Sequence, residues 1–345
     1  MLAFIAAALL AVQTPGPAPA APPAPPRAVE LMMAGQAADP EFETARAALL
    51  ADAQAGNAAA MRWMGVLAAS GAVEADAETW FRRAMNAGDG DERARAAFAL
   101  AGYLAGRSDG AAQSRALLEG IEEAPEDIRA DVIGYLGADY LFGFGGEVRA
   151  EQGRALLNSA IAQGFEDPAV LDSYGGYMLG VDRLRAMELW ARAANAGSAN
   201  AAWRYAMAML ENGGDAAQAY EYVSWAAARG HLQARISKAV MLATGQGVET
   251  DAAAARQAYE SAALDGSAHA LRGLGVLYAQ GEGGPADAAT GYALLALAAE
   301  AGDEVASRLL ADPPDTFEAR PPAAAVEAAG AAWLEANALS AATFQ

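Results

Sequence analysis

The 345-residue chain contains no cysteine, only one lysine and only two histidines. Without a thiol the chain can form no disulfide and offers no thiolate as nucleophile or metal ligand. Two widely separated histidines do not give the ligand spacing of a metal centre either. We therefore predict no metal site and no cofactor.

Positive charge is also scarce, because 23 Lys and Arg stand against 43 Asp and Glu, a formal net charge of −20. A field of this sign repels phosphate backbones and anionic lipid surfaces, so we expect no nucleic-acid partner. Alanine dominates the 54% of hydrophobic residues, whereas β-branched residues are few. This composition favours closely packed helices over sheets.

A long apolar run is missing as well. Residues 1–12, MLAFIAAALLAV, are too few to span a bilayer comfortably, but they suit the apolar region of a secretory signal. Ala18 and Ala20 are small residues at the positions that a signal peptidase reads. We expect a signal peptide over residues 1–20, a proline-rich linker over 21–40 and an exported protein of the bacterial periplasm with no stable membrane insertion after cleavage. No Lys or Arg precedes the run, so an uncleaved tether remains the alternative.

An internal repeat is marked by glycines that follow runs of small residues. Four of them lie 33, 36 and 36 residues apart, namely Gly197, Gly230, Gly266 and Gly302, and Gly88 follows a similar run. The residues 11, 7, 4 and 3 places before such a glycine are apolar and share one side of a helix. Glycine readily adopts the left-handed conformation that ends many helices. Each of these glycines is therefore predicted to end a helix.

A new helix is predicted to begin directly after the glycine, where Ser198, Ser267 or Asp167 can cap its first N–H groups. Within this helix a small residue recurs, and its recurrence predicts close approach of a neighbouring helix. These positions hold Gly65, Gly137, Gly175, Ala206, Ala239 and Gly275. Linkers of variable length then lead to a second helix, so the repeating unit is helix–loop–helix.

These features resemble the Sel-1-like repeat family, the variable-period relatives of tetratricopeptide repeats. The resemblance is carried by Leu274-Gly275 with Tyr278, by Gly245-Gln246-Gly247-Val248 with Asp251 and Ala255, and by Ala262-Ala263 before Gly266. It implies an all-α, right-handed α-solenoid over residues 56–302, with about seven units starting near 56, 91, 128, 166, 197, 230 and 266. It also implies first helices that line a concave surface, and no enzymatic activity. A strict tetratricopeptide array, with a constant period of 34, is the competing interpretation.

The ends of a solenoid expose apolar surface unless a modified unit covers them. We expect a capping helix over residues 41–55 and capping helices over residues 303–345. Trp333 and Leu334 are the apolar residues predicted to cover the C-terminal end.

One enzyme signature occurs, because residues 106–110 spell G-x-S-x-G around Ser108. A nucleophile elbow needs a preceding strand, whereas a helix is predicted here and Ser-Asp-Gly is common in turns. His231 follows Gly230 and is expected to cap a helix or face solvent. We assign no catalytic residue, and a cell-envelope hydrolase built on a helical scaffold remains the alternative function.

The favoured function is a non-enzymatic scaffold that binds a protein or peptide on the concave face. If the recurring small residue faces the second helix of its own repeat, residues three and six before it and one after it point the opposite way. Trp and Arg are frequent binding hot spots, although Trp203 could equally fill space between repeats. The predicted partner-binding residues are Arg62, Asp172, Asn200, Trp203, Arg204, Met207, Gln233, His269 and Arg272.

Overall fold

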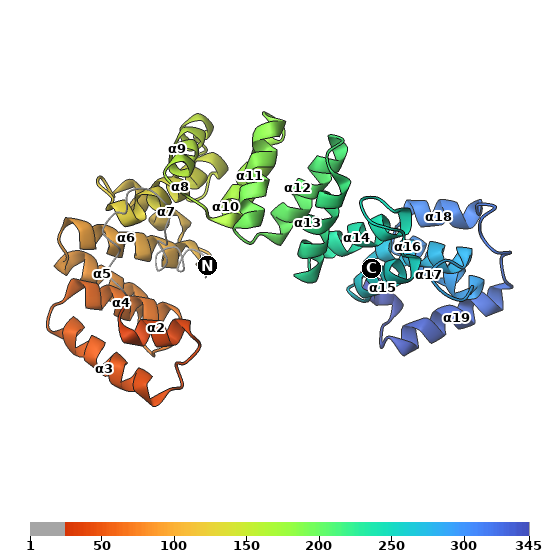
Figure 1. Cartoon of the computed structure of the whole chain (residues 1–345). Helices are drawn as coiled ribbons and strands as arrows, with labels where there is room; N and C mark the ends of the chain where they lie inside the picture. Colours follow the sequence, from red (N-terminus) through yellow and green to blue (C-terminus); the bar gives the residue numbers. More distant parts are fainter. Residues whose placement is uncertain (1–24, 345) are drawn as a thin grey trace. The chain divides into compact units, whose positions relative to one another are not determined.

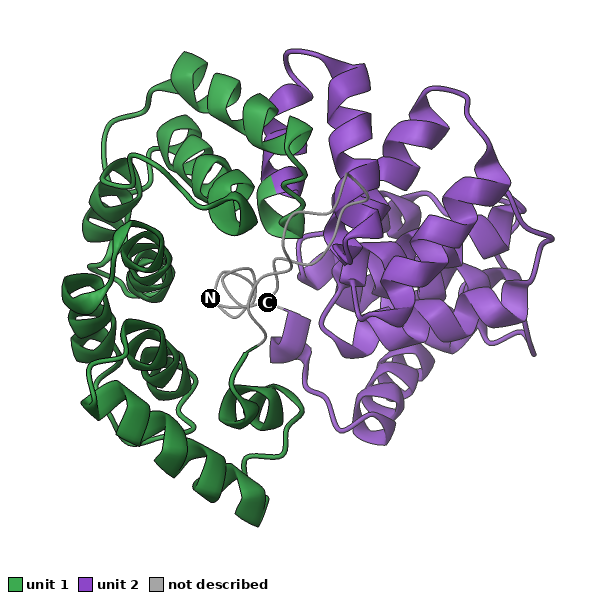
Figure 2. Cartoon of the chain, turned by 60° about the vertical axis from the view of Figure 1, so that its left-hand side comes forward, with its two compact units in different colours: residues 1–170 green, residues 171–345 purple. Residues whose placement is uncertain are grey.

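The computed structural model describes residues 25–344. Regular structure in this range is entirely helical, with eighteen α-helices, one short 3-10 helix and no strand (Figure 1). Most helices pack against their neighbours in sequence, which is the arrangement of an α-solenoid. The all-α solenoid predicted from the sequence is confirmed. The chain divides into two compact units, one ending at Val170 and one beginning at Leu171 (Figure 2).

The first unit is a succession of antiparallel helix pairs preceded by two further helices. Its helices are α2 (Arg27–Met33), α3 (Pro40–Gln54), α4 (Ala58–Ala69), α5 (Ala77–Ala87), α6 (Gly90–Ala105), α7 (Ala111–Glu119), α8 (Glu126–Phe142) and α9 (Ala150–Ala162). The unit boundary falls inside α10 (Pro168–Met178).

The second unit continues with α11 (Arg183–Asn195), α12 (Ala199–Glu211), α13 (Ala216–Ala228), α14 (Leu232–Thr244), α15 (Ala252–Leu264), α16 (Ala268–Gln280), α17 (Ala288–Glu300), α18 (Glu304–Ala311), α19 (Ala323–Ala336) and the 3-10 helix η1 (Ala341–Phe344). Between residues 56 and 302, seven successive pairs run from α4/α5 to α16/α17. This is the predicted number of helix–loop–helix units. The first member of each pair is called a first helix below.

The predicted glycine stops are confirmed, and all but one of these glycines have the expected left-handed conformation. Gly197 follows α11 with φ +104°, and Gly230, Gly266 and Gly302 are also left-handed. Gly88 ends α5 as predicted, but with φ −78° and an extended backbone, so the left-handed conformation expected there was wrong. A Cβ there would lie 3.0 Å from both Ala84 O and Arg93 N. Gly88 is small because the two helices meet closely around it.

The recurring small residues contact the second helix of their own repeat, as predicted. A Cβ at Gly65 would lie 2.6 Å from the ring of Phe81, and one at Gly175 would lie 2.6 Å from the ring of Trp190. The first helix therefore presents its opposite side away from its partner helix.

The N-terminal end differs from the linker expected over residues 21–40. Residues 27–33 form α2, and Ala28, Val29 and Leu31 are buried in one core with Phe42 of α3. The proline-rich composition ends at Pro26, and RAVELMM then supplies an apolar helix face. The expected signal peptide over residues 1–20 lies outside the described residues. At the other end α19 packs on α17, and Trp333 and Phe344 share a buried core with residues of α17.

Candidate partner-binding surface

Arg62 is the one predicted binding residue in the first unit, and it is buried. Its side chain in α4 is 5% exposed, and its Nε donates to Oε1 of Glu92 in the first turn of α6 at 2.5 Å. Its guanidinium also lies 4.4 Å from the centre of the Trp63 ring. Arg62 therefore joins two repeats and presents little surface to a partner.

Asp172 and Asn200 are bonded to each other across neighbouring first helices. Asn200 Nδ2 of α12 donates to Asp172 Oδ2 of α10 at 2.5 Å. The Asn200 Oδ1 atom lies 3.2 Å from Nε2 of His231, whose Nδ1 accepts the N–H of Ala234 at 3.1 Å and so caps α14. The capping expected of His231 is confirmed. Since Nδ1 accepts, Nε2 carries the proton, and burial lowers the pKa of His231.

Trp203 also reaches the next repeat. Its Nε1 donates to Ser237 Oγ of α14 at 3.0 Å, and its ring centre lies 5.4 Å from that of His231. The side chain is half-buried in the apolar core of this part of the second unit. This geometry supports the packing role that the sequence left open for Trp203.

Arg272 and His269 of α16 converge on one carboxylate. Arg272 Nη1 contacts both oxygens of Asp303 at 2.9 and 3.0 Å, and His269 Nε2 lies 3.8 Å from Oδ2 of the same residue. Asp303 is 2% exposed and also caps α18 through the N–H of Ala306. The Arg272 side chain is 26% exposed, whereas that of His269 is 63% exposed.

The same kind of bridge recurs along both units, and we call these contacts the inter-repeat ladder. A side chain on one first helix bonds either to a residue within the next first helix or to the N-cap of the helix that follows the pair. In the first unit the other examples are Arg95 to Asp127, at 2.9 and 3.0 Å, and Tyr135 to Asp167, at 2.8 Å. Five of the nine predicted residues, namely Arg62, Asp172, Asn200, Trp203 and Arg272, belong to the ladder, which orients successive repeats.

Arg204, Gln233 and Met207 are more accessible. The Arg204 side chain is 39% exposed, and its Nε lies 3.7 Å from Asp172 Oδ1. Gln233 is exposed in the first turn of α14, and Met207 is half-buried at the middle of α12. These residues share with His269 the side of the first helices that faces away from their second helices.

Helical spacing places three residues of each first helix on one stripe of its surface, namely those six before, one after and five after the recurring small residue. We call the nine such residues of α12, α14 and α16 the first-helix face. It consists of Asn200, Met207, Glu211, Gln233, Val240, Thr244, His269, Val276 and Gln280. Its middle positions are all apolar, and Val240 is 39% exposed. We call Met207, Val240 and Val276 the apolar row.

Sequence reasoning missed two residues of the apolar row, Val240 and Val276, although they occupy the same repeat position as Met207. It also missed two buried arginines. Arg115 of α7 donates to Glu147 O at 3.0 Å, and Arg256 of α15 donates to Leu277 O at 3.0 Å. Each also stacks on a tyrosine of the following first helix. The available signal was an arginine two helices before each of two glycine-rich loops, on α7 for residues 143–146 and on α15 for residues 281–284.

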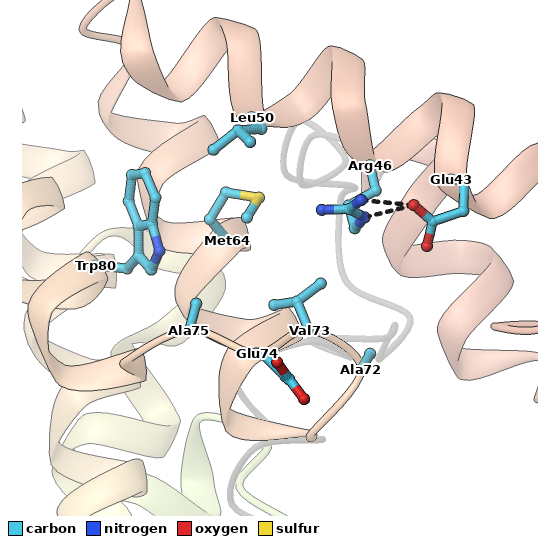
Figure 3. Close-up of a pocket in the computed structure, with 9 residues that line it drawn as sticks. All are labelled: Glu43, Arg46, Leu50, Met64, Ala72, Val73, Glu74, Ala75 and Trp80. Carbon is cyan, nitrogen blue, oxygen red and sulfur yellow. Dashed lines mark hydrogen bonds and ion pairs between the residues drawn. The ribbon is translucent and has the colours of Figure 1, made fainter.

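A separate cleft of about 480 Å³ lies in the first unit between α3, α4 and the loop before α5. Leu50, Met64, Val73 and Trp80 line it, and Glu43 and Arg46 form an ion pair beside it (Figure 3). None of the predicted binding residues lines it. Its lining contains no histidine or serine.

The enzyme signature around Ser108 has the wrong structural context. Ser108 is exposed in the turn between α6 and α7, and a helix precedes it where a nucleophile elbow requires a strand. Within residues 25–344, no group of three or more His, Asp or Glu residues is arranged to hold a metal ion. No helix in the same range is both long and apolar enough to cross a membrane.

No protein-family model matches the chain, and no curated protein sequence matches it significantly. Among solved structures, it resembles a protective antigen present in uropathogenic Escherichia coli strains, which displays an SLR (Sel-1-like repeat) fold. The TM-score is 0.66 and the identity 19%, over 88% of this chain and 66% of the antigen. The chain thus spans about two-thirds of the antigen's length.

A second match is a Sel1 repeat protein from Oxalobacter formigenes, with 23% identity and a TM-score of 0.49 over 58% of this chain and 84% of that protein. At such identities the likeness concerns the fold. The likeness to the antigen agrees with the resemblance carried by the repeat glycines and the helix pairs. The chain therefore has a fold similar to that of Sel-1-like repeat proteins.

Proposed function

We propose that this protein is a non-enzymatic scaffold that binds a peptide segment of a partner protein on the first-helix face of the second unit. The observation that carries this proposal is the apolar row, because Val240 is 39% exposed in the middle of a regular helix. Gly176 and Ala138 occupy the same repeat position in α10 and α8. The fold therefore does not require a large apolar side chain there, and binding gives a reason for one.

Polar side chains beside the row support the same function. Arg204, Gln233 and His269 lie beside the row and can bind polar groups of a partner. A surface with an apolar centre and a polar rim is typical of protein interfaces.

We further propose that the protein is exported and acts in the bacterial periplasm, after removal of residues 1–20. The apolar run over residues 1–12 and the small residues Ala18 and Ala20 support this proposal. Mass spectrometry of the protein purified from its native cells tests it. A mature chain that begins at Ala21 is expected, and a soluble cytoplasmic chain that begins at Met1 would contradict export.

Site-specific photo-crosslinking in native cells tests the binding surface. A photoreactive amino acid replaces Val240 in one variant of the full chain and Val148, which is 62% exposed in the α8–α9 loop, in the control variant. We expect a discrete adduct with a second protein from position 240 and none of the same mass from position 148. Adducts that form equally from both positions, or only from 148, would refute the proposed surface.

A further inference from the structure

Three consecutive first helices are joined through the side chains of Asp172 on α10, Asn200 on α12 and His231 at the start of α14. Asn200 Nδ2 donates to Asp172 Oδ2 at 2.5 Å, and His231 Nε2 lies 3.2 Å from Asn200 Oδ1. The other ring nitrogen of His231, Nδ1, accepts the N–H of Ala234 at 3.1 Å. One imidazole therefore makes a bond to the preceding repeat and a bond to its own helix.

A proton on this ring affects the two bonds in opposite ways. Neutral imidazole has one donor and one acceptor, whereas imidazolium has two donors. Nε2–H of the charged ring can still donate to Asn200 Oδ1, and a charge-assisted hydrogen bond is stronger than a neutral one. Nδ1–H can no longer accept from Ala234, and positive charge is unfavourable at a helix N-terminus. Protonation therefore favours the bond to α12 and removes the cap of α14.

Two charged side chains of the neighbouring first helices face the ring, Asp172 of α10 and Arg204 of α12. The Asp172 side chain is 13% exposed, and its Oδ1 atom is buried without a hydrogen-bond partner, 3.7 Å from Arg204 Nε. Burial lowers the pKa of His231, the charge of Asp172 opposes this shift and that of Arg204 adds to it. The carboxylate behind Asn200 thus stabilises an imidazolium that is bonded to Asn200.

Other charged side chains near the start of α14 have different partners. The Arg229 guanidinium, at the end of α13, lies 3.7 Å from the centre of the Trp225 ring. Arg235, one turn into α14, is bonded to Asp265 at the end of α15. The proton on His231 is therefore governed by Asp172 and Arg204 together with burial of the ring.

The caps of the two neighbouring first helices do not contain an imidazole. Ser198 Oγ accepts the N–H of Ala201 at 3.1 Å at the start of α12. Ser267 Oγ accepts the N–H of Ala270 at 3.2 Å at the start of α16. A serine hydroxyl keeps its acceptor at every pH at which the chain is folded. These two caps are built-in controls for the cap of α14.

We propose that His231 is an acid-sensitive cap, which holds the first turn of α14 in neutral solution and in acid releases it while staying bound to Asn200. The first turn of α14 then opens locally, whereas the buried residues from Ala239 onward hold the remainder of the helix. Gln233 of the first-helix face lies in this turn, so the face at α14 becomes dependent on pH. The inference does not depend on partner binding.

Hydrogen exchange of single backbone amides, measured by NMR on the full chain at pH 7.5 and pH 5, tests the release of the cap. The protection factor of the Ala234 amide should fall at least fivefold more than those of Ala201 and Ala270. In the His231→Ser variant, which has a cap that does not titrate, Ala234 should change in parallel with the two control amides. Equal changes at the three amides of the wild type, or the same selective loss in the variant, would overturn the proposal.

The imidazole ¹⁵N signals test the bond to Asn200. The chain has two histidines, so a His269→Gln variant identifies the signals of His231. We expect the Nε2–H form at pH 7.5. Asp172→Asn should lower the pKa of His231 further, because it removes the charge that stabilises the imidazolium. An Nδ1–H form at neutral pH, or an unchanged pKa of His231 in a folded Asp172→Asn variant, would refute the proposal.

Discussion

The Nε2 atom of His231 lies 3.2 Å from Oδ1 of Asn200, so one imidazole both caps α14 and bonds to α12. Protonation of Nδ1 would remove the acceptor of the cap. Ser198 and Ser267 cap the first helices on either side of α14 without a titratable group. This contact is thus the member of the inter-repeat ladder that contains an imidazole.

The first prediction concerns this cap. His231→Ala should lower the free energy of unfolding at pH 8 by about 1 kcal/mol, the usual cost of a lost N-cap. His231→Ser should cost less, because a serine caps the equivalent helices. Chemical denaturation measures both. Equal losses for the two variants would show that the cap contributes nothing.

The pH dependence of His231 has a definite sign. Burial places its folded-state pKa below the ordinary value of 6.5. As the pH falls through 6.5, the unfolded chain binds the proton first, and the contribution of His231 to stability is progressively lost. The stability of the His231→Ser variant should therefore fall less than that of the wild type between pH 8 and pH 5. A parallel decline in the two proteins would contradict this.

The second prediction concerns Arg272 and Asp303. Asp303→Ala removes the cap of α18 and leaves the half-buried Arg272 unpaired, so it should cost about 3 kcal/mol of unfolding free energy. Asp303→Asn retains a capping oxygen and should cost clearly less. Thermal unfolding of both variants tests this. An unchanged midpoint for Asp303→Ala would show that this contact does not stabilise the fold.

The third prediction concerns Asp131, whose pKa is raised to about 7 by burial and by the nearby Asp167 and Asp127. The folded chain holds this proton up to about pH 7, whereas the unfolded chain releases it near 3.8, so stability falls as the pH rises between these values. Asp131→Asn should therefore raise the midpoint at pH 8 and change it little at pH 4. Asp109→Asn, at an 82% exposed side chain, is the control and should have no such pH-dependent effect.

The fourth prediction concerns Trp203. Trp203→Ala should cost about 2 kcal/mol, less than a fully buried tryptophan, because the side chain is half-buried in the core of the second unit. Trp203→Phe keeps most of the packing and loses the bond to Ser237, so it should cost about 1 kcal/mol. Differential scanning calorimetry distinguishes these costs. A Trp203→Ala variant with the wild-type midpoint would contradict the packing role and favour the interpretation of Trp203 as a binding residue.

The repeat architecture could be predicted because it follows from the spacing of glycines and apolar residues along the sequence. The interval between Gly197 and Gly230 predicts a helix pair, and the caps at Ser198 and Ser267 follow from residue type alone. Gly88 was misjudged because glycine serves close approach as well as left-handed turns, and sequence does not separate the two. The helix α2 was missed because its seven residues follow directly on a proline-rich segment.

The inter-repeat ladder could not be derived from helical periodicity, since each bond joins residues about one repeat apart. Arg272 was predicted as a binding residue because it points away from α17, but the same direction takes it to Asp303, the N-cap of α18. Complementary charges one repeat apart, as in Arg62 with Glu92, were the available signal. The apolar row required comparison of equivalent positions, which links Met207 with Val240.

The central claim is that the ladder determines stability and the apolar row determines binding. Isothermal titration calorimetry of the captured partner, with thermal midpoints measured on the same samples, tests it most directly. Val240→Gln should weaken partner binding by at least fivefold with the wild-type midpoint, and Trp203→Ala should lower the midpoint. Wild-type affinity in the folded Val240→Gln variant would contradict the account.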